Sequence, residues 1–316
     1  MKKVLFITAS DLHFADWGQF NEDGRRITAH LDVWGKLEAQ CIKHNVPLLM
    51  PGDWFHNPKN LSNRLLNMVL PVLVKTKINK IFGIDGNHDQ DGISTLDKKP
   101  YGYMNLLSQL SDSFINCNFT TEYHDNCAIH GIPYLTHNIG FVKNVESIKL
   151  NDTGYNILMI HTDLPGAVDT NGREVGTSEG LTKQYSKLFA RFDLVLAGHI
   201  HKPQQLASNV LMVGAPQQQN RGDRKCEFGY WKIYDDLSFK FFEIKSPKFK
   251  TAESNDSTDS YNYWTISHSN KKDKKVFKSS PKKTERGAIN NYIKDSGIKK
   301  HRAKFLKTLL NKAKND

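Results

Sequence analysis

The sequence predicts a layered α/β fold, and two patterns support this prediction. Short apolar runs rich in β-branched residues are typical of buried strands. Longer stretches with apolar residues at helical spacing lie between several of these runs. Strands and helices that alternate in this way are typical of α/β proteins. With 316 residues, the chain is long enough to bury one large core and still carry an additional element.

The expected elements follow one another along the chain. The strand-like runs of the first two-thirds of the chain are residues 3–8, 46–50, 80–84, 155–160 and 192–197. The expected helices are residues 28–45, 61–75, 101–110 and 180–190. After residue 201 only strand-like runs follow, at 210–213, 228–234 and 238–244. We expect these last runs to complete a second sheet.

Each of the first five strand-like runs is followed by side chains that bind metals in proteins. Carboxylate oxygens, amide oxygens and imidazole nitrogens are ligands of divalent cations. The residues concerned are Asp11, His13, Asp53, Asn87, His161, His199 and His201. Because sites in α/β proteins gather beyond the carboxyl ends of strands, we expect these side chains to share one crevice. Such a set suits two adjacent metals, with positions left open for water and phosphate.

Taken singly, most of these motifs have a simpler explanation. Asp11 with His13 is typical of a turn or a helix cap, Gly-Asp is a turn signal, and a lone His161 is typical of an interior histidine. The segment 198–201, Gly-His-Ile-His, is more specific, because it places two imidazoles on the same side of an extended chain. The ordered set, with each member after a strand, is what favours a metal centre.

The ordered motifs resemble those of the calcineurin-like metallophosphoesterase superfamily. The resemblance implies a four-layer α/β/β/α sandwich with a two-metal phosphoesterase centre. It makes His88 the catalytic histidine near the leaving oxygen, and Asp89 the carboxylate that orients His88. For the first metal it implies the ligands Asp11, His13, Asp53 and His201. For the second it implies Asp53, which is shared, with Asn87, His161 and His199.

A narrower resemblance concerns residues 52–58, Gly-Asp-Trp-Phe-His-Asn-Pro. This string is similar to that of SbcD-type repair nucleases, which include bacteriophage recombination nuclease subunits. Segments 100–105, 213–218 and 229–231 also resemble that family. The resemblance implies that His56 contacts the phosphate or orients the scissile strand, although a surface-loop histidine is the simpler alternative. It also implies a homodimer, formed through helices near residues 61–75 and 101–111.

Three functions are compatible with these residues. The first is a DNA exo/endonuclease subunit that acts with an SbcC-like SMC-type ATPase. The second is a stand-alone phosphodiesterase or phosphatase, which His56 and the C-terminal region argue against. The third is a non-catalytic scaffold, which the intact ligand set and His88 argue against. Manganese is the expected ion, because the mixed set of ligands suits it, while zinc and iron remain alternatives.

The C-terminal region carries the whole net charge of +11. Residues 246–316 contain 18 basic and 7 acidic side chains, whereas residues 1–245 contain 26 of each. We therefore expect a nuclease domain at 1–245, a polar linker at 246–283 and a basic helical hairpin at 284–316. The hairpin is too small to bury its apolar stripe alone. By resemblance, the stripe binds the ATPase through Ile289, Tyr292, Ile293, Phe305, Leu306, Leu309 and Leu310. The alternatives are a helix docked on its own domain or a nonspecific DNA tail.

Composition excludes a membrane protein and favours a reducing compartment. No apolar run approaches the roughly 20 residues of a membrane-spanning helix. The four cysteines are widely spaced, which predicts unpaired thiols and a cytoplasmic protein. A further basic cluster, Arg221, Arg224 and Lys225, follows a strand-like run. It is either a solvated loop or a contact with the DNA backbone.

Overall fold

Two six-stranded sheets form the centre of the structure, a computed structural model that describes residues 2–18, 21–57, 59, 61–90, 102–136, 138–175, 179–251 and 263–266. The first sheet has the order β14 (Phe239–Glu243), β13 (Gly229–Tyr234), β1 (Val4–Thr8), β2 (Leu48–Met50), β3 (Ile81–Gly83) and β4 (Phe114–Asn116). The second has the order β11 (Gln204–Ala207), β12 (Val210–Met212), β10 (Leu194–Gly198), β7 (Tyr155–His161), β6 (Cys127–Ile132) and β5 (Thr121–His124).

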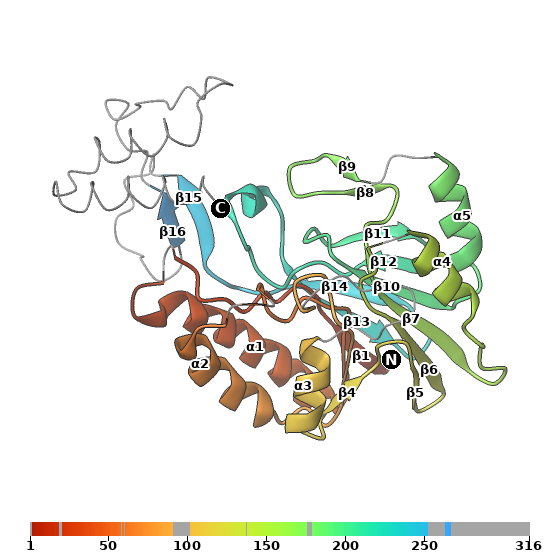
Figure 1. Ribbon diagram of the computed structural model, residues 1–316, viewed down its shortest axis with the longest axis horizontal. Helices are drawn as coiled ribbons and strands as arrows, with labels where there is room; N and C mark the ends of the chain where they lie inside the picture. The colour runs from red at the N-terminus through yellow and green to blue at the C-terminus, as the bar shows by residue number, and fades with distance from the viewer. Residues whose placement is uncertain are drawn as a thin grey trace, which may run out of the picture. The chain divides into compact units, whose positions relative to one another are not determined.

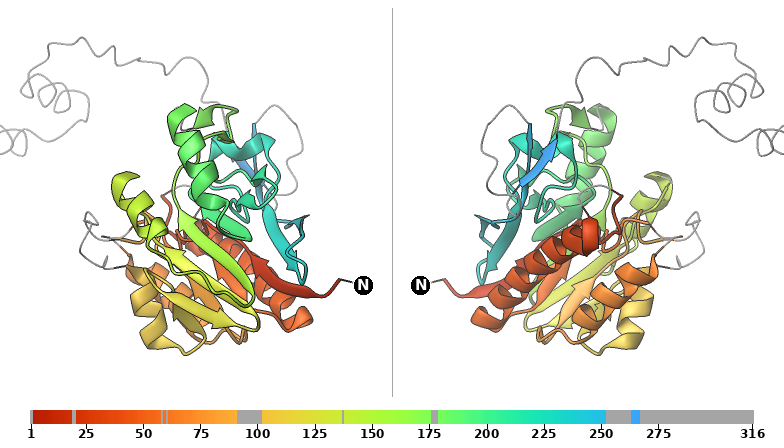
Figure 2. Two further views of the ribbon diagram at one scale, coloured as in Figure 1. Left: turned by 90° about the vertical axis from the view of Figure 1, so that its right-hand side faces the viewer. Right: turned by 90° about the vertical axis from the view of Figure 1, so that its left-hand side faces the viewer.

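Helices cover the outer face of each sheet. The first sheet is covered by α1 (Arg25–His44), α2 (Asn63–Val74) and α3 (Tyr103–Leu110), and the second by α4 (Asn138–Glu146) and α5 (Glu179–Phe189) (Figures 1 and 2). The order of layers is therefore helix, sheet, sheet, helix. This arrangement confirms the expected α/β/β/α sandwich.

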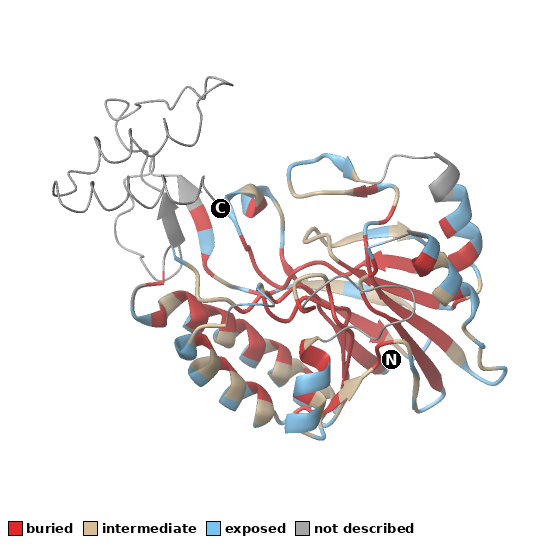
Figure 3. Ribbon diagram, viewed as in Figure 1, coloured by how far each residue is buried: buried red, intermediate tan, exposed pale blue. Residues whose placement is uncertain are grey.

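Alternation along the strands divides the apolar side chains among three cores. Phe6, Leu49 and Phe82 point into the core between the two sheets. Their neighbours in the chain, such as Ile7 and Leu48, pack against the helices of the first sheet. In the second sheet, Leu158, Val195 and Met212 pack against α4 and α5 in the same way. Figure 3 shows that the central strands are buried along most of their length. Burial on both faces explains why these strands are continuously apolar in the sequence.

The direction of the strands brings the polar loops together. β1, β2 and β3 are mutually parallel, and so are β6, β7, β10 and β12. Gly198, the last residue of β10, lies opposite His161, the last residue of β7. Within each sheet, the loops that follow these parallel strands therefore all lie at the same end of the strands.

Several elements differ from the expectation. Of the three runs expected to complete a second sheet, only β12 does so, whereas β13 and β14 extend the first sheet because β13 pairs antiparallel with β1. The segment that holds β4, β5, β6 and α4 was not expected to be regular, because His130 and Gly131 interrupt the apolar pattern of β6 and because β5 is polar. Two more short pairs are β8 (Ala167–Val168) with β9 (Glu174–Val175), and β15 (Lys248–Thr251) with β16 (Tyr263–Ile266). The second pair lies within the range expected as a linker. In β15, Phe249 is buried, and its N–H donates to Gln218 Oε1 at 2.7 Å.

The expected partner-binding stripe lies outside the described residues. Its residues are Ile289, Tyr292, Ile293, Phe305, Leu306, Leu309 and Leu310.

None of the helices in the described part of the chain combines the length and the apolar character needed to span a bilayer.

Candidate metal centre

The loops beyond the strands adopt backbone conformations that are uncommon for residues other than glycine. Asp11, His13, Asp53 and His199 have positive φ values of 55°, 48°, 56° and 98°. Such residues cost free energy and cluster at functional sites, where surrounding contacts hold them. Here the N–H of Asp11 donates to the Gly52 carbonyl at 3.0 Å, and the N–H of His13 donates to the Asp53 carbonyl at 3.0 Å. The loops after β1 and β2 therefore fix each other.

Two glycines allow these loops to come so close. Gly52 has a φ of 96°, and a Cβ added to it would lie 2.4 Å from His161 Nδ1. A Cβ added to Gly86 would lie 2.1 Å from Asp53 Oδ1. Because no side chain fits at either position, glycine is required there for steric reasons.

One half of the centre gathers around Asp53, Asn87, His161 and His199. His161 Nε2 lies 3.2 Å from Asp53 Oδ2 and 3.1 Å from Asn87 Oδ1. Asn87 Oδ1 also lies 2.9 Å from His199 Nδ1. The other ring nitrogen of His161 donates to the Pro51 carbonyl at 2.7 Å, which turns Nε2 toward the carboxylate. All four residues expected at the second metal are therefore adjacent.

The other half gathers around Asp11, His13 and His201. His13 Nε2 lies 3.2 Å from His201 Nε2 and 4.0 Å from Asp11 Oδ1. It also lies 3.4 Å from Asp53 Oδ2, the same oxygen that faces His161. Asp53 Oδ2 thus stands between the two halves, where a shared ligand is expected.

The chemistry of this cluster fits two divalent cations. Asp11 and Asp53 are buried, and buried carboxylates are costly unless a cation compensates them. Burial lowers the pKa of His13 well below its ordinary value, so its ring is neutral and can act as a ligand. Although burial opposes its charge, Asp53 raises the pKa of His161 to about 9. A cation at this position would replace the proton between the two groups.

Two further histidines lie beside the half of the centre that contains His13. His56 Nδ1 is 3.2 Å from His13 Nδ1, and the ring of His56 stacks on that of His88 at 4.7 Å between centroids and 15° between planes. His88 Nδ1 donates to the His56 carbonyl at 2.7 Å, which leaves Nε2 to meet a substrate. The His88 N–H donates to Asp53 Oδ1 at 2.9 Å. The structure therefore places both histidines at the centre.

Asp89 does not contact His88 as expected. Its Oδ1 accepts hydrogen bonds from the N–H groups of Trp54 and Phe55 at 2.9 and 3.0 Å, and its Oδ2 accepts from the N–H of Gly86 at 2.9 Å. The residue that orients the His88 ring is His56, through its carbonyl. Asp89 instead ties the loop after β3 to the loop after β2. Burial and the charges of Asp53 and Asp85 raise the pKa of Asp89 well above its ordinary value.

Three supporting residues were not expected from the sequence. Asp163 Oδ1 lies 3.2 Å from His199 Nε2, and Asp223 Oδ2 lies 3.9 Å from His201 Nδ1. The Gln219 side chain donates to the carbonyls of Asp11 and Leu12 at 3.1 and 3.2 Å. Such contacts orient ligating side chains. Only Asp163 carries a sequence signal, because it follows His161 by two residues, whereas the other two come from a distant loop.

Comparison with known proteins shows the family to which this chain belongs. The family model for the calcineurin-like phosphoesterase matches residues 4–203. No curated protein matches the chain. Among solved structures, the chain resembles the sulfate thiohydrolase SoxB of Thermus thermophilus in complex with glycerol, with a TM-score of 0.41 and 9% identity over 75% of this chain. The match spans 56% of the length of that protein.

Proposed function

Because the chain belongs to the calcineurin-like phosphoesterase family, we propose that it hydrolyses phosphodiester bonds of DNA as a nuclease subunit in recombination or repair. Members of this family are metal-dependent phosphoester hydrolases. The observation that carries the proposal is the position of Asp53 Oδ2 between two groups of metal-binding side chains. The choice of DNA depends in addition on His56 and its surroundings.

We assign the residues of the centre to separate roles in hydrolysis. Asp11, His13 and His201 would hold one ion and Asn87, His161 and His199 the other, with Asp53 shared. Two divalent ions bound there would neutralise the phosphate and lower the pKa of an attacking water. In this proposal His88 protonates the departing sugar oxygen through Nε2. We propose manganese as the activating ion, because the mixed oxygen and nitrogen ligands suit it.

The surroundings of His56 support a nucleic-acid substrate. The Trp17 ring lies 4.3 Å from the His56 ring, between centroids, and the Arg26 guanidinium lies 4.2 Å from the Trp17 centroid. The Trp17 ring is tilted by 40° against the His56 ring, which stacks on His88, so three rings follow one another beside the centre. Arg26 is buried and supports Trp17 from within the protein. Aromatic rings beside a catalytic centre are typical of sites that bind nucleic-acid strands. A small phosphomonoester has no need of such a surface.

Digestion of end-labelled duplex and single-stranded DNA tests this function. We expect the wild type with manganese to cleave DNA and to hydrolyse bis-p-nitrophenyl phosphate. His88→Gln should cleave DNA about 10²- to 10⁴-fold more slowly, because the leaving oxygen then receives no proton. Metal content measured by mass spectrometry should stay near that of the wild type. Replacing manganese with zinc or iron compares the alternative ions.

The outcomes separate the three functions. Hydrolysis of the small diester without cleavage of DNA would support a stand-alone phosphodiesterase. Less than one transition metal per chain after loading, with no hydrolysis, would support a scaffold. Equal DNA cleavage by wild type and His88→Gln would contradict the role given to His88.

We also propose that residues 284–316 bind an SbcC-like SMC-type ATPase and that the protein forms a homodimer in the cytoplasm. The apolar stripe of the C-terminal region supports the first part, and the exposed Val72, Leu106 and Leu110 on α2 and α3 support the second. Deleting residues 284–316 should leave hydrolysis of the small diester intact and abolish co-purification with the ATPase. Light scattering of the same samples measures the dimer. An ATPase complex that survives the deletion would contradict this docking role.

A further inference from the structure

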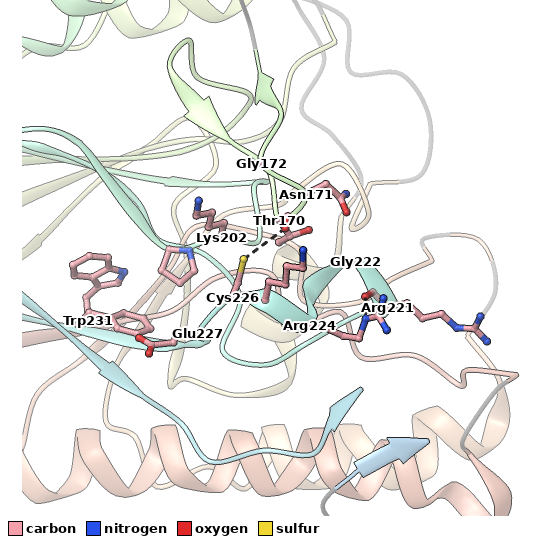
Figure 4. Close-up of a pocket in the computed structure, with 13 residues that line it drawn as sticks. Thr170, Asn171, Gly172, Lys202, Arg221, Gly222, Arg224, Cys226, Glu227 and Trp231 are labelled. Carbon is pink, nitrogen blue, oxygen red and sulfur yellow. Dashed lines mark hydrogen bonds between the residues drawn. The ribbon is translucent and has the colours of Figure 1, made fainter. Parts of the chain in front are cut away.

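A cavity of about 970 Å³ lies beside the metal centre. Four basic side chains line it, together with the carboxylate of Glu227. The basic residues are Lys202, Arg221, Arg224 and Lys225. The turn at residues 170–172, between β8 and β9, also lines the cavity. Figure 4 shows Arg221 at one end of the cavity and Trp231 at the other.

This concentration of positive charge is local. Basic and acidic residues are equal in number over residues 1–245, so an average patch of this domain has no net charge. Arg221, Arg224 and Lys225 are exposed, and no carboxylate of the described residues pairs with any of them. Unpaired cations in a concave surface attract a polyanion strongly, because the field is focused there.

The turn that carries three of the basic residues is fixed relative to the metal centre. Arg221, Arg224 and Lys225 belong to the short 3-10 helix η2 (Arg221–Lys225), whose interior residue Asp223 is fully buried. Asp223 Oδ2 accepts hydrogen bonds from the N–H groups of Gln219 and Asn220 at 2.7 and 3.0 Å.

The same Asp223 oxygen lies 3.9 Å from His201 Nδ1, and Lys202 directly follows His201 in the chain. A phosphate in this cavity is therefore close to one held at the centre.

The far end of the cavity has a different character. Trp231 and Phe241 line it and contact each other at 5.2 Å between centroids and 63° between planes. The cavity thus leads from a cationic end to an aromatic end. Both rings pack into the core between the two sheets, and Trp231 is buried, so they give the cavity an apolar wall and not a stacking surface. A single inorganic phosphate uses only the cationic end, whereas a nucleic-acid strand also has sugars to place against the apolar wall.

From this geometry we propose that the cavity binds the sugar–phosphate backbone of the DNA strand next to the phosphodiester held at the metal centre. The proposal rests on the function proposed above. It assigns Arg221, Arg224 and Lys225 to phosphates beyond the scissile one. The residues do not take part in the chemical step, so small substrates do not need them.

The triple variant Arg221→Ala, Arg224→Ala, Lys225→Ala tests the proposal. Binding of a fluorescent single-stranded oligonucleotide is measured in the His88→Gln background, so that the DNA is not consumed. We expect the Kd to rise by about 10- to 100-fold at low salt, and the slope of log K against log salt to fall by about 2. In the catalytically intact background, kcat/KM for bis-p-nitrophenyl phosphate should not change.

A matched control removes three exposed lysines that lie near the amino-terminal ends of the strands of the first sheet, away from the metal centre. Lys43 lies ahead of β2, and Lys75 and Lys77 lie ahead of β3, whereas the metal centre lies after these strands. The control variant Lys43→Ala, Lys75→Ala, Lys77→Ala should bind the oligonucleotide as the starting protein does. A Kd that the cavity variant leaves unchanged, or that the control raises equally, would overturn the proposal.

The same measurements separate this inference from the proposed function. If the wild type cleaves DNA and the cavity variant binds as tightly as its parent, the nuclease assignment stands and the cavity proposal fails. If the wild type does not cleave DNA but the cavity variant alone loses oligonucleotide binding, the cavity proposal stands and the nuclease assignment fails.

Discussion

The metal centre and the basic cavity are neighbours that are built in opposite ways. At the centre, Asp11 and Asp53 are buried, and hydrogen bonds between their loops hold both in uncommon backbone conformations. In the cavity, Arg221 and Lys225 are exposed, and only the turn that carries them is fixed. Hydrolysis requires atoms at defined positions, whereas attraction of a polyanion requires mainly charge. The difference indicates that the two regions contribute separately to catalysis and to substrate binding.

Substitution of Asp53 should have the largest effect, because both halves of the centre depend on it. We expect Asp53→Asn to reduce hydrolysis of both DNA and bis-p-nitrophenyl phosphate by more than about 10²-fold. The neutral amide compensates less of the charge of two cations, so metal content should fall as well. Steady-state kinetics and mass spectrometry of the metal-loaded protein check this. An Asp53→Asn protein that keeps two metals and wild-type rates would contradict the shared position of Asp53. The cavity variant is expected to affect DNA alone, which sharpens the comparison.

Substitution of Asp89 should have a smaller effect that acts through the loops. Asp89→Ala leaves the N–H groups of Trp54, Phe55 and Gly86 without their acceptor. We expect the free energy of unfolding to fall by about 3 kcal/mol, because each unsatisfied buried donor is costly. Urea denaturation with a metal chelator present measures this without a contribution from metal binding.

The exposed Asp152 provides the control for this measurement. Asp152→Ala should change the free energy of unfolding by less than about 0.5 kcal/mol. If Asp89→Ala is as stable as this control, the tie between the two loops is unimportant. Direct orientation of His88 by Asp89 would instead appear as a loss of rate at unchanged stability.

The sequence predicted the metal centre better than its surroundings for a physical reason. Asp11, Asp53 and His161 each follow an apolar strand at short range, so their shared position could be inferred from the direction of parallel strands. The position of Asp89 beside His88 in the chain gave a misleading expectation, because its side chain accepts bonds from loop N–H groups instead. Adjacency in sequence does not determine where a side chain points.

The parts that were not predicted depend on contacts between distant segments. The cavity is lined by residues from the segments 170–172, 202–203 and 221–231, and no local sequence pattern indicates that these segments are adjacent in the fold. Asp223 could not be linked to His201 for the same reason. In the fold, β4, β5 and β6 were missed because polar residues and glycine interrupt their alternation. Pairing with β3 and β7 compensates for this weak local preference.

Gly86, which lies in close contact with Asp53, limits which substitutions this enzyme can accept during evolution. A single methyl group at Gly86 would collide with the carboxylate, and one at Gly52 would collide with His161, so these two positions of the inner loops tolerate only glycine. New substrate preferences must then arise at the periphery, where η2 and the β8–β9 turn carry exposed side chains around the buried Asp223. Selection experiments that aim at altered specificity should randomise these exposed positions and leave Asp223 and the inner loops untouched.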